Sequence, residues 1–144
     1  MRIVSVLEDQ KIEKRIAITP EIAKKYLALG FEVALPENYA DHLGIKDNEY
    51  TELGVNISRD EQKIISSADV IVQLGLPIDE KSSLIKENQT LIGVLNPYTN
   101  EDKINNLVKK NINVLSLELL PRITRAQSMD VLSSQANLAG YKAV

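Results

Sequence analysis

Short apolar runs alternate with amphipathic stretches through most of the chain. The apolar runs are rich in Ile, Leu and Val, as expected for buried strands, and cover residues 3–7, 31–35, 70–74, 91–95 and 112–117. Apolar residues at helical spacing lie between these runs, over residues 20–30, 47–53, 79–85 and 100–110. This alternation of strands and helices favours an α/β domain with a mostly parallel sheet and right-handed crossovers.

Two helix starts carry local sequence signals. The Thr-Pro-Glu sequence at 19–21 is typical of an N-cap, a first helical position and a first-turn acid, and Gly30 supplies a left-handed stop. Ser58 and Glu61 have the spacing of a capping box. The sequence therefore predicts one helix that begins at Pro20 and another that is capped by Ser58.

The last part of the chain has a different character. Pro121 ends the strand-like run, a polar segment follows at 122–128, and a helix with an amide- and hydroxyl-rich face is predicted over 130–144. No glycine cap follows this helix, so we expect the chain to belong to a longer protein. We interpret residues 1–127 as one lobe and residues 128–144 as a helix that leads out of it.

Composition and charge narrow the possible functions. The chain is 44% hydrophobic and 26% charged, which is typical of one soluble globular domain. Its net charge of -3 does not indicate the basic surface that nucleic-acid binding requires. With no Cys and one His, the sequence predicts neither a thiolate nor a polyhistidine metal site. No signal peptide or membrane-spanning run is present, so any link to a membrane must come through partners.

The glycines do not form a phosphate-binding loop. The six glycines lie at positions 30, 44, 54, 75, 93 and 140, and none of them forms G-x-G-x-x-G or a P-loop. The predicted fold is therefore a Rossmann-like three-layer domain that lacks the dinucleotide fingerprint, and we assign it no dinucleotide site of its own. We expect the isolated chain to bind a dinucleotide such as NADH weakly or not at all.

Two single residues have both a functional and a structural interpretation, and a third has a structural one only. Arg15 follows the first strand, where ligands of parallel sheets bind, and its fork suits a substrate carboxylate; the alternative is a solvated cation. Asn96 follows the strand at 91–95 and either points into the same crevice or forms an Asn-Pro turn. His42 has no nucleophile near it and is interpreted as a surface or turn histidine.

The strongest chemical signal lies around the start of the last helix. Arg122, Gln127, Asp130 and Ser133 offer a guanidinium, an amide, a carboxylate and a hydroxyl next to small helical residues. These groups suit the recognition of a carboxamide and of ribose hydroxyls, and they form no evident proton-transfer pair. The alternative is a capped helix preceded by a solvated charged loop.

Two stretches resemble a known family. Residues 13–20 (EKRIAITP) and residues 121–144 (PRITRAQSMDVLSSQANLAGYKAV) are similar to the N-terminal part of the alanine dehydrogenase and nicotinamide nucleotide transhydrogenase family. The second stretch is specific to the transhydrogenase branch. Supporting matches at residues 68–71, Pro77 and residues 91–97 extend the resemblance over essentially the whole chain.

This resemblance implies a fold, a reaction and partners. It implies the first lobe of a soluble alpha subunit that binds NAD(H) and passes hydride to NADP(H) on a partner domain, coupled to proton translocation through a membrane domain. It further implies a homodimer of the complete alpha subunit on the cytoplasmic side of a bacterial inner membrane, and a glycine-rich lobe that follows the last helix.

The resemblance also implies roles for the polar segment. By similarity, Arg122, Asp130 and Ser133 orient the nicotinamide carboxamide, while Gln127 reaches the ribose and the facing NADP domain. Hydride transfer between two nicotinamide rings needs no acid or base, so catalysis consists of positioning the rings and excluding water.

The sequence departs from the family at two positions. Alanine dehydrogenases have a Lys after the strand at 68–71 and a His where this chain has Asn96, and alignment on Pro77 places Gln73 at the Lys position. The transhydrogenase branch commonly keeps that Lys too. Both departures count against one alternative to a transhydrogenase subunit, an alanine dehydrogenase-like oxidoreductase. The other alternative, a non-catalytic binding or assembly module, is distinguished by whether a glycine-rich lobe follows in the complete protein.

Overall fold

The computed structural model describes residues 1–143, which form an all-parallel sheet of six strands in the order β3-β2-β1-β4-β5-β6. The strands are β1 (Arg2–Val4), β2 (Glu32–Pro36), β3 (Asn56–Ser58), β4 (Val70–Val72), β5 (Thr90–Gly93) and β6 (Asn113–Ser116). The strand order reverses at β1, which pairs with β2 on one side and β4 on the other. This is the doubly wound Rossmann-like order, as the sequence predicts, and its ligand crevice lies beyond the carboxyl ends of the strands.

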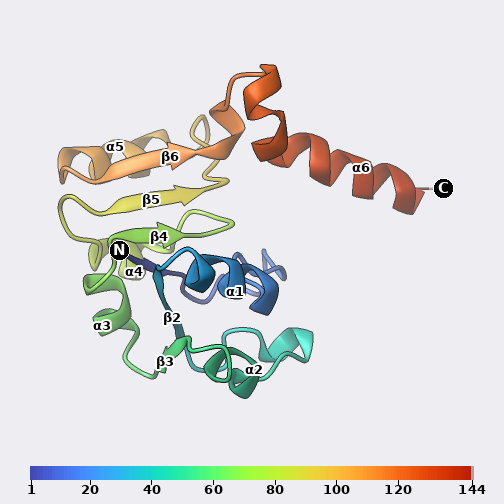
Figure 1. Cartoon of the computed structure of the whole chain (residues 1–144). Coiled ribbons are helices and arrows are strands. Elements are labelled where there is room, and N and C mark those ends of the chain that lie inside the picture. Colours follow the sequence, from blue (N-terminus) through green and yellow to red (C-terminus); the bar gives the residue numbers. More distant parts are fainter. Residues whose placement is uncertain (144) are drawn as a thin grey trace.

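The connecting segments are mainly short helices (Figure 1). They comprise α1 (Pro20–Ala28), α2 (Asp47–Thr51), α3 (Glu61–Ser66), α4 (Asp79–Ser83), α5 (Glu101–Lys109), α6 (Val131–Ala143) and the 3-10 helices η1 (Asp41–Leu43), η2 (Leu117–Leu119) and η3 (Thr124–Met129). Thr19 caps α1 by accepting a hydrogen bond from the Ile22 backbone N–H, and Gly30 takes φ +83° just after its end. Both features match the sequence prediction.

Two apolar cores lie on opposite faces of the sheet, because neighbouring residues of a strand point to opposite sides. Val4 of β1 belongs to a core with residues of α3 and α5, whereas Ile3 belongs to a core with Ala23 of α1 and Tyr50 of α2. Helices therefore cover both faces, and the domain has the three layers that the sequence predicts. In the part of the chain that the structure describes, no helix is long and apolar enough to cross a bilayer.

The structure corrects the prediction around residue 58. Ser58 ends β3, a strand that the sequence pattern does not predict, and it does not cap a helix. Asp60 caps α3, where its carboxylate accepts a hydrogen bond from the Lys63 backbone N–H at 2.9 Å. The predicted capping box is wrong because Asp60 stands directly before the helix and leaves Glu61 in its first turn.

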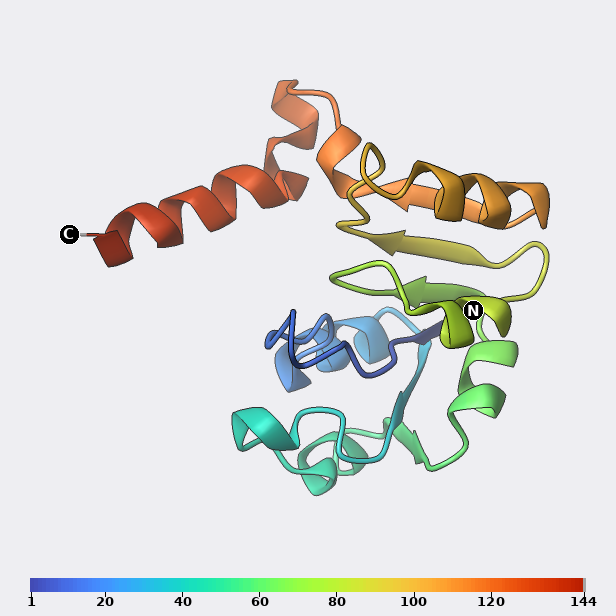
Figure 2. The same cartoon turned by 180° about the vertical axis from the view of Figure 1, so that it is seen from behind.

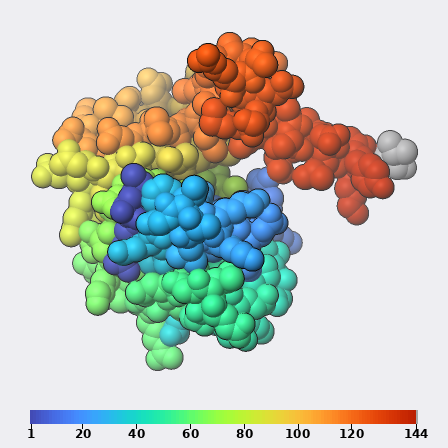
Figure 3. All heavy atoms as spheres, in the orientation of Figure 1, coloured from blue at the N-terminus to red at the C-terminus, as the bar shows by residue number. Residues whose placement is uncertain are grey.

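The carboxyl-terminal segment leaves the body of the domain. The polar stretch after Pro121 is not an open loop, because residues Thr124–Met129 form η3, and α6 starts at Val131. Figures 1 and 2 show α6 projecting from the sheet, and Figure 3 shows it as an arm beside the body. The predicted last residue of this helix, Val144, lies outside the described residues.

Candidate functional site

The first cavity lies where the sheet passes into α6 and has a volume of about 540 Å³. All four polar residues of the sequence prediction line it, namely Arg122, Gln127, Asp130 and Ser133. Its apolar wall includes Leu117 of η2 and Ala136 of α6. The fold therefore brings the predicted guanidinium, amide, carboxylate and hydroxyl to a single concave surface.

Asp130 fixes the start of α6. One carboxylate oxygen accepts hydrogen bonds from the backbone N–H groups of Leu132 (3.0 Å) and Ser133 (3.1 Å), and the other accepts from Ser133 Oγ at 2.6 Å. The Ser133 hydroxyl is the main cause of a lowered Asp130 pKa, to which the Arg122 charge adds. Asp130 is therefore ionised at neutral pH and accepts hydrogen bonds rather than supplying a proton.

Arg122 and Gln127 keep their polar atoms available. Both side chains are exposed, and within residues 1–143 neither makes a side-chain hydrogen bond, although both line the cavity. Ala126, which is 5% exposed, anchors η3 between them. Gln127 thus offers its amide from a short, anchored helix, and Arg122 offers its guanidinium from the segment just before that helix.

Glu118 belongs to this cavity too, and sequence reasoning missed it. Its carboxylate accepts hydrogen bonds from the backbone N–H groups of Leu95 and Asn96 and from Ser116 Oγ. Burial raises its pKa, but these hydrogen bonds outweigh burial and leave the pKa lowered. Glu118 therefore joins the end of β5 to η2, and the only sequence signal for it is a carboxylate within an apolar run.

A second cavity of about 830 Å³ lies beyond the carboxyl ends of β1, β4 and β5, and both Gln73 and Asn96 line it. Gln73 is only 2% exposed, and its Oε1 accepts hydrogen bonds from Ser5 Oγ (2.7 Å) and the Val6 backbone N–H (3.0 Å). Ser5 Oγ in turn accepts from the Tyr39 hydroxyl at 2.8 Å. Gln73 is therefore fixed as part of a buried network.

Asn96 has the turn conformation that was one of its two predicted interpretations. Its φ is +47°, and its carbonyl oxygen accepts hydrogen bonds from the backbone of Thr99 and Asn100. Its exposed side chain still borders the second cavity, so the turn and the crevice interpretations both describe it.

Comparison with known proteins identifies the family. Residues 5–139 match the family model described as "Alanine dehydrogenase/PNT, N-terminal domain". The chain belongs to this family. An NAD(P) transhydrogenase alpha-subunit protein of Rickettsia prowazekii is 42% identical over 148 residues, covering 100% of this chain and 39% of that protein. The chain thus spans about two fifths of the length of this relative.

Solved structures agree with the family. The transhydrogenase from Sinorhizobium meliloti superposes with a TM-score of 0.90 at 38% identity, covering 98% of this chain and 42% of that one. An L-alanine dehydrogenase superposes with a TM-score of 0.76 at 18% identity, over 82% of this chain and 32% of that one, which shows a shared fold alone. Within the alanine dehydrogenase/PNT family, this chain is therefore much more similar to transhydrogenases.

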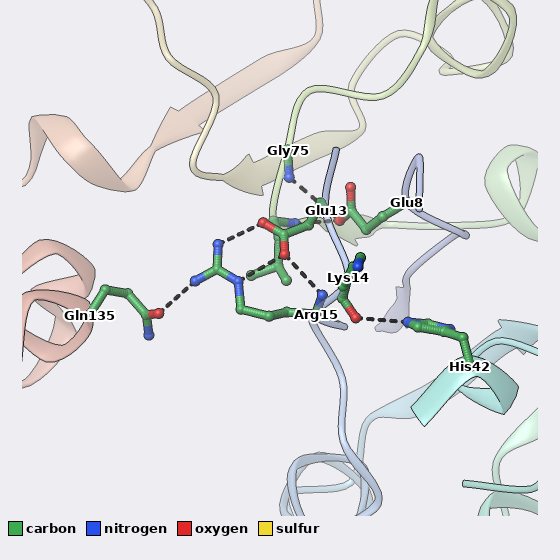
Figure 4. A network of polar contacts seen from close by, with 8 residues as sticks. Glu8, Glu13, Lys14, Arg15, His42, Gly75 and Gln135 are labelled. Atoms are coloured by element: carbon green, nitrogen blue, oxygen red, sulfur yellow. Dashed lines mark hydrogen bonds and ion pairs between the residues drawn. The ribbon is translucent and has the colours of Figure 1, made fainter. Parts of the chain in front are cut away.

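Two other residues considered in the sequence analysis, Arg15 and His42, lie in or against the loop after β1. The Arg15 fork holds the Glu13 carboxylate of the same chain (Figure 4), and its role toward a substrate carboxylate stays a prediction. His42 is exposed, as expected, and hydrogen-bonds the Lys14 carbonyl oxygen at 2.8 Å. Among residues 1–143, no group of three or more His, Asp or Glu side chains is placed to hold a metal ion.

Glu8 gives the second cavity a pH-sensitive group. Burial raises the pKa of its carboxyl above the ordinary 4.5, with a contribution from Glu13, although the backbone N–H of Leu74 hydrogen-bonds it at 2.6 Å. The folded state therefore binds this proton more tightly than the unfolded state does. The resulting stability is fully present below the ordinary pKa and is lost as the pH rises through the raised pKa.

We expect Glu8→Gln to remove this loss, because the amide keeps an acceptor for the Leu74 N–H group but cannot ionise. Urea unfolding midpoints should then fall less than those of the unmodified chain as the pH rises above the ordinary carboxyl pKa of 4.5. Glu32→Gln, at an exposed position of β2, is the matched control and should leave the pH dependence almost unchanged. If the urea midpoints of Glu8→Gln and of the unmodified chain change with pH in the same way, the raised pKa does not belong to Glu8.

Proposed function

We propose that this chain is the first lobe of the alpha subunit of a proton-translocating NAD(P) transhydrogenase. The observation that carries the proposal is the first cavity, where Arg122, Gln127, Asp130 and Ser133 meet without an acid–base pair. The 42% identity to a transhydrogenase alpha subunit supports it. On this proposal, the lobe works with NAD(H), and a partner domain holds NADP(H).

The residues of the cavity fit a nicotinamide. Arg122 and Gln127 offer free N–H groups to a carboxamide oxygen, and the ionised Asp130 offers acceptor oxygens to an amide N–H or to a ribose hydroxyl. A volume of about 540 Å³ is large enough for a nicotinamide and its ribose. The apolar wall at Leu117 and Ala136 would help to exclude water.

The contribution of the chain to the reaction is positioning. A bound dihydronicotinamide supplies the hydride, and the transfer to a second nicotinamide involves no proton held by the protein. Arg122, Asp130 and Ser133 would orient the carboxamide, and Gln127 would reach the ribose and the facing NADP(H) domain. Holding the two rings at near-contact distance is the main source of rate in such a reaction.

The remaining parts of the proposal concern the assembly. The lobe comprises residues 1–127, and residues 128–144 lead toward the lobe that completes the NAD(H) site. The partners are the NADP(H)-binding domain, the membrane domain and a second alpha subunit. The complex would place this lobe on the cytoplasmic side of the bacterial inner membrane, and the isolated chain would be inactive.

Arg122→Lys tests the proposed site. Lys keeps the charge but loses the planar fork, so hydride transfer from NADH to NADP⁺ in the complete, reconstituted complex should fall by about 10-fold to about 100-fold. Arg125→Lys is the matched control, because Arg125 lies in the same polar segment, on η3, but does not line the cavity. Equal rates for the two variants would place the nicotinamide elsewhere.

The same proposal predicts that the complete protein lacks alanine dehydrogenase activity. Reductive amination needs protonatable groups at the substrate carbonyl, and Gln73 and Asn96 do not titrate near neutral pH. In addition, Gln73 Oε1 already accepts hydrogen bonds from Ser5 and Val6. An assay with pyruvate, ammonia and NADH should show no turnover, and robust turnover by repurified protein would favour an amino-acid dehydrogenase instead.

A further inference from the structure

The arm α6 packs against η2 near its start, and it is joined to the rest of the lobe by one hydrogen bond beyond its first turn. Its side chains from Leu132 to Ala143 are exposed, and Leu138 and Tyr141 are 61% and 87% exposed. Within residues 1–143, a single hydrogen bond joins α6 to any residue before Asp130: Arg15 Nη1 donates to Gln135 Oε1 at 2.6 Å. These two residues are 120 positions apart in the sequence.

Arg15 is rigidly held for this contact. Its Nε donates to one Glu13 carboxylate oxygen at 2.8 Å and its Nη2 donates to the other at 2.6 Å (Figure 4). Glu13 is the less exposed partner, at 22%, and the Arg15 hydrogen bond is the main cause of its lowered pKa. A bidentate pair fixes the plane of the guanidinium, so the Nη1 group is directed at α6.

The loop that carries Arg15 is itself anchored to η1. His42 Nε2 lies 2.8 Å from the Lys14 carbonyl oxygen, and Gln10 Nε2 lies 3.3 Å from His42 Nδ1. An amide nitrogen only donates and a carbonyl oxygen only accepts, so the imidazole carries its proton on Nε2. The contacts therefore run from η1 through the loop and Arg15 to Gln135.

Gln135 shares the first turns of α6 with the residues of the first cavity. Asp130 caps this helix by accepting hydrogen bonds from Leu132 and Ser133, and Ser133 and Ala136 line the cavity on either side of Gln135 in sequence. A helix is stiff over such a short span, so fixing Gln135 also fixes Asp130 and Ser133 relative to the sheet. If the Arg15–Gln135 bond breaks, the cavity wall is free to shift while its own hydrogen bonds stay intact.

We propose that Glu13, Arg15 and Gln135 form a clasp that positions α6, and that Arg15 acts in hydride transfer as a positioning residue rather than as a ligand for a substrate anion. This inference rests on the proposed function. It assigns Arg15 a different role from the one that its position in the sequence favours.

A double-mutant cycle in the complete, reconstituted complex tests the clasp. Arg15→Ala and Gln135→Ala should each lower the rate of NADH to NADP⁺ hydride transfer about 10-fold, and the double variant should also lose about 10-fold rather than about 100-fold. NADH affinity, measured by calorimetry, should change by less than about 2-fold, so that the loss falls on the rate. Additive losses in the double variant would overturn the proposal.

Conservative variants separate a clasp from a general structural role. Gln135→Glu keeps an acceptor for Arg15 and should retain the unmodified rate, whereas Arg15→Lys loses the fork and should resemble Arg15→Ala. Lys14→Ala is the matched control, because the Lys14 side chain makes no hydrogen bond or ion pair within residues 1–143 and its carbonyl remains to accept from His42. If Arg15→Lys keeps the full rate, a single positive charge suffices and the clasp is wrong.

The two proposals fail in different ways. Absence of hydride transfer in the unmodified complex would overturn the proposed function and the positioning role together. Normal transfer in the unmodified complex that is unchanged by Arg15→Ala would overturn the positioning role alone.

Discussion

Gln127→Asn is expected to slow hydride transfer about 100-fold in the reconstituted complex. Asn keeps the amide but shortens the side chain by one methylene group, so the contact that Gln127 is proposed to make with the ribose and the NADP(H) domain is displaced by roughly 1 Å. Such a displacement is costly when the rate depends on near-attack geometry. Single-turnover stopped-flow measurements report the rate, and calorimetry reports NADH affinity.

NADH affinity should change less than the rate, because the proposed lobe beyond α6 supplies most of the nucleotide contacts. The fold should survive, since the Gln127 side chain is exposed. Gln62→Asn makes the same chemical change on the exposed surface of α3 and should transfer hydride at the unmodified rate. If Gln127→Asn also transfers at that rate, the segment at 122–128 is not the positioning element.

Gly93→Ala is expected to destabilise the fold by about 3 kcal/mol, the upper end of the usual cost of overpacking. A Cβ atom at Gly93 would lie 2.5 Å from the Gln73 carbonyl oxygen and 3.0 Å from Leu95 Cδ2. The Gln73 backbone cannot withdraw easily, because its N–H group donates to the Ile92 carbonyl oxygen at 2.9 Å and its side chain is held by Ser5 and Val6. Urea unfolding measures the loss.

Gly140→Ala is the control for this substitution. Nothing lies within 4 Å of a Cβ atom at Gly140, which is inside α6, so Ala should maintain stability or raise it by up to about 1 kcal/mol through its higher helix propensity. Equal unfolding free energies for Gly93→Ala and the unmodified chain would show that β4 and β5 separate readily at this point.

The sequence predicts the architecture well where apolar runs are long. The runs ending at Leu7, Leu74 and Leu95 overlap β1, β4 and β5, although each strand ends earlier than its run. Two of the runs continue because residues just after the strands, Val6 and Leu95, still pack in the apolar core. The strand β3 was missed because its three residues, Asn56–Ser58, begin and end with polar side chains and pair only with β2 at the sheet edge.

The sequence predicts which residues line the candidate site, but not the distant residues that hold the site in place. Arg122, Gln127, Asp130 and Ser133 lie within one short segment, so their grouping could be foreseen, and their role in binding stays a prediction. Glu118 acts on backbone N–H groups more than 20 residues away, and Arg15 contacts Gln135 across 120 positions. No local pattern encodes such contacts, because tertiary packing alone creates them.

Isotope transfer tests the central claim most directly. The complete, reconstituted complex is given NADP⁺ and NADH that is fully deuterated at C4 of the nicotinamide ring, and mass spectrometry follows the label. We expect deuterium to appear in NADPH with no exchange into water, because direct hydride transfer passes the atom between rings without a protein acid or base. NADPH without deuterium, or deuterium found only in alanine when pyruvate and ammonia are supplied, would contradict the account.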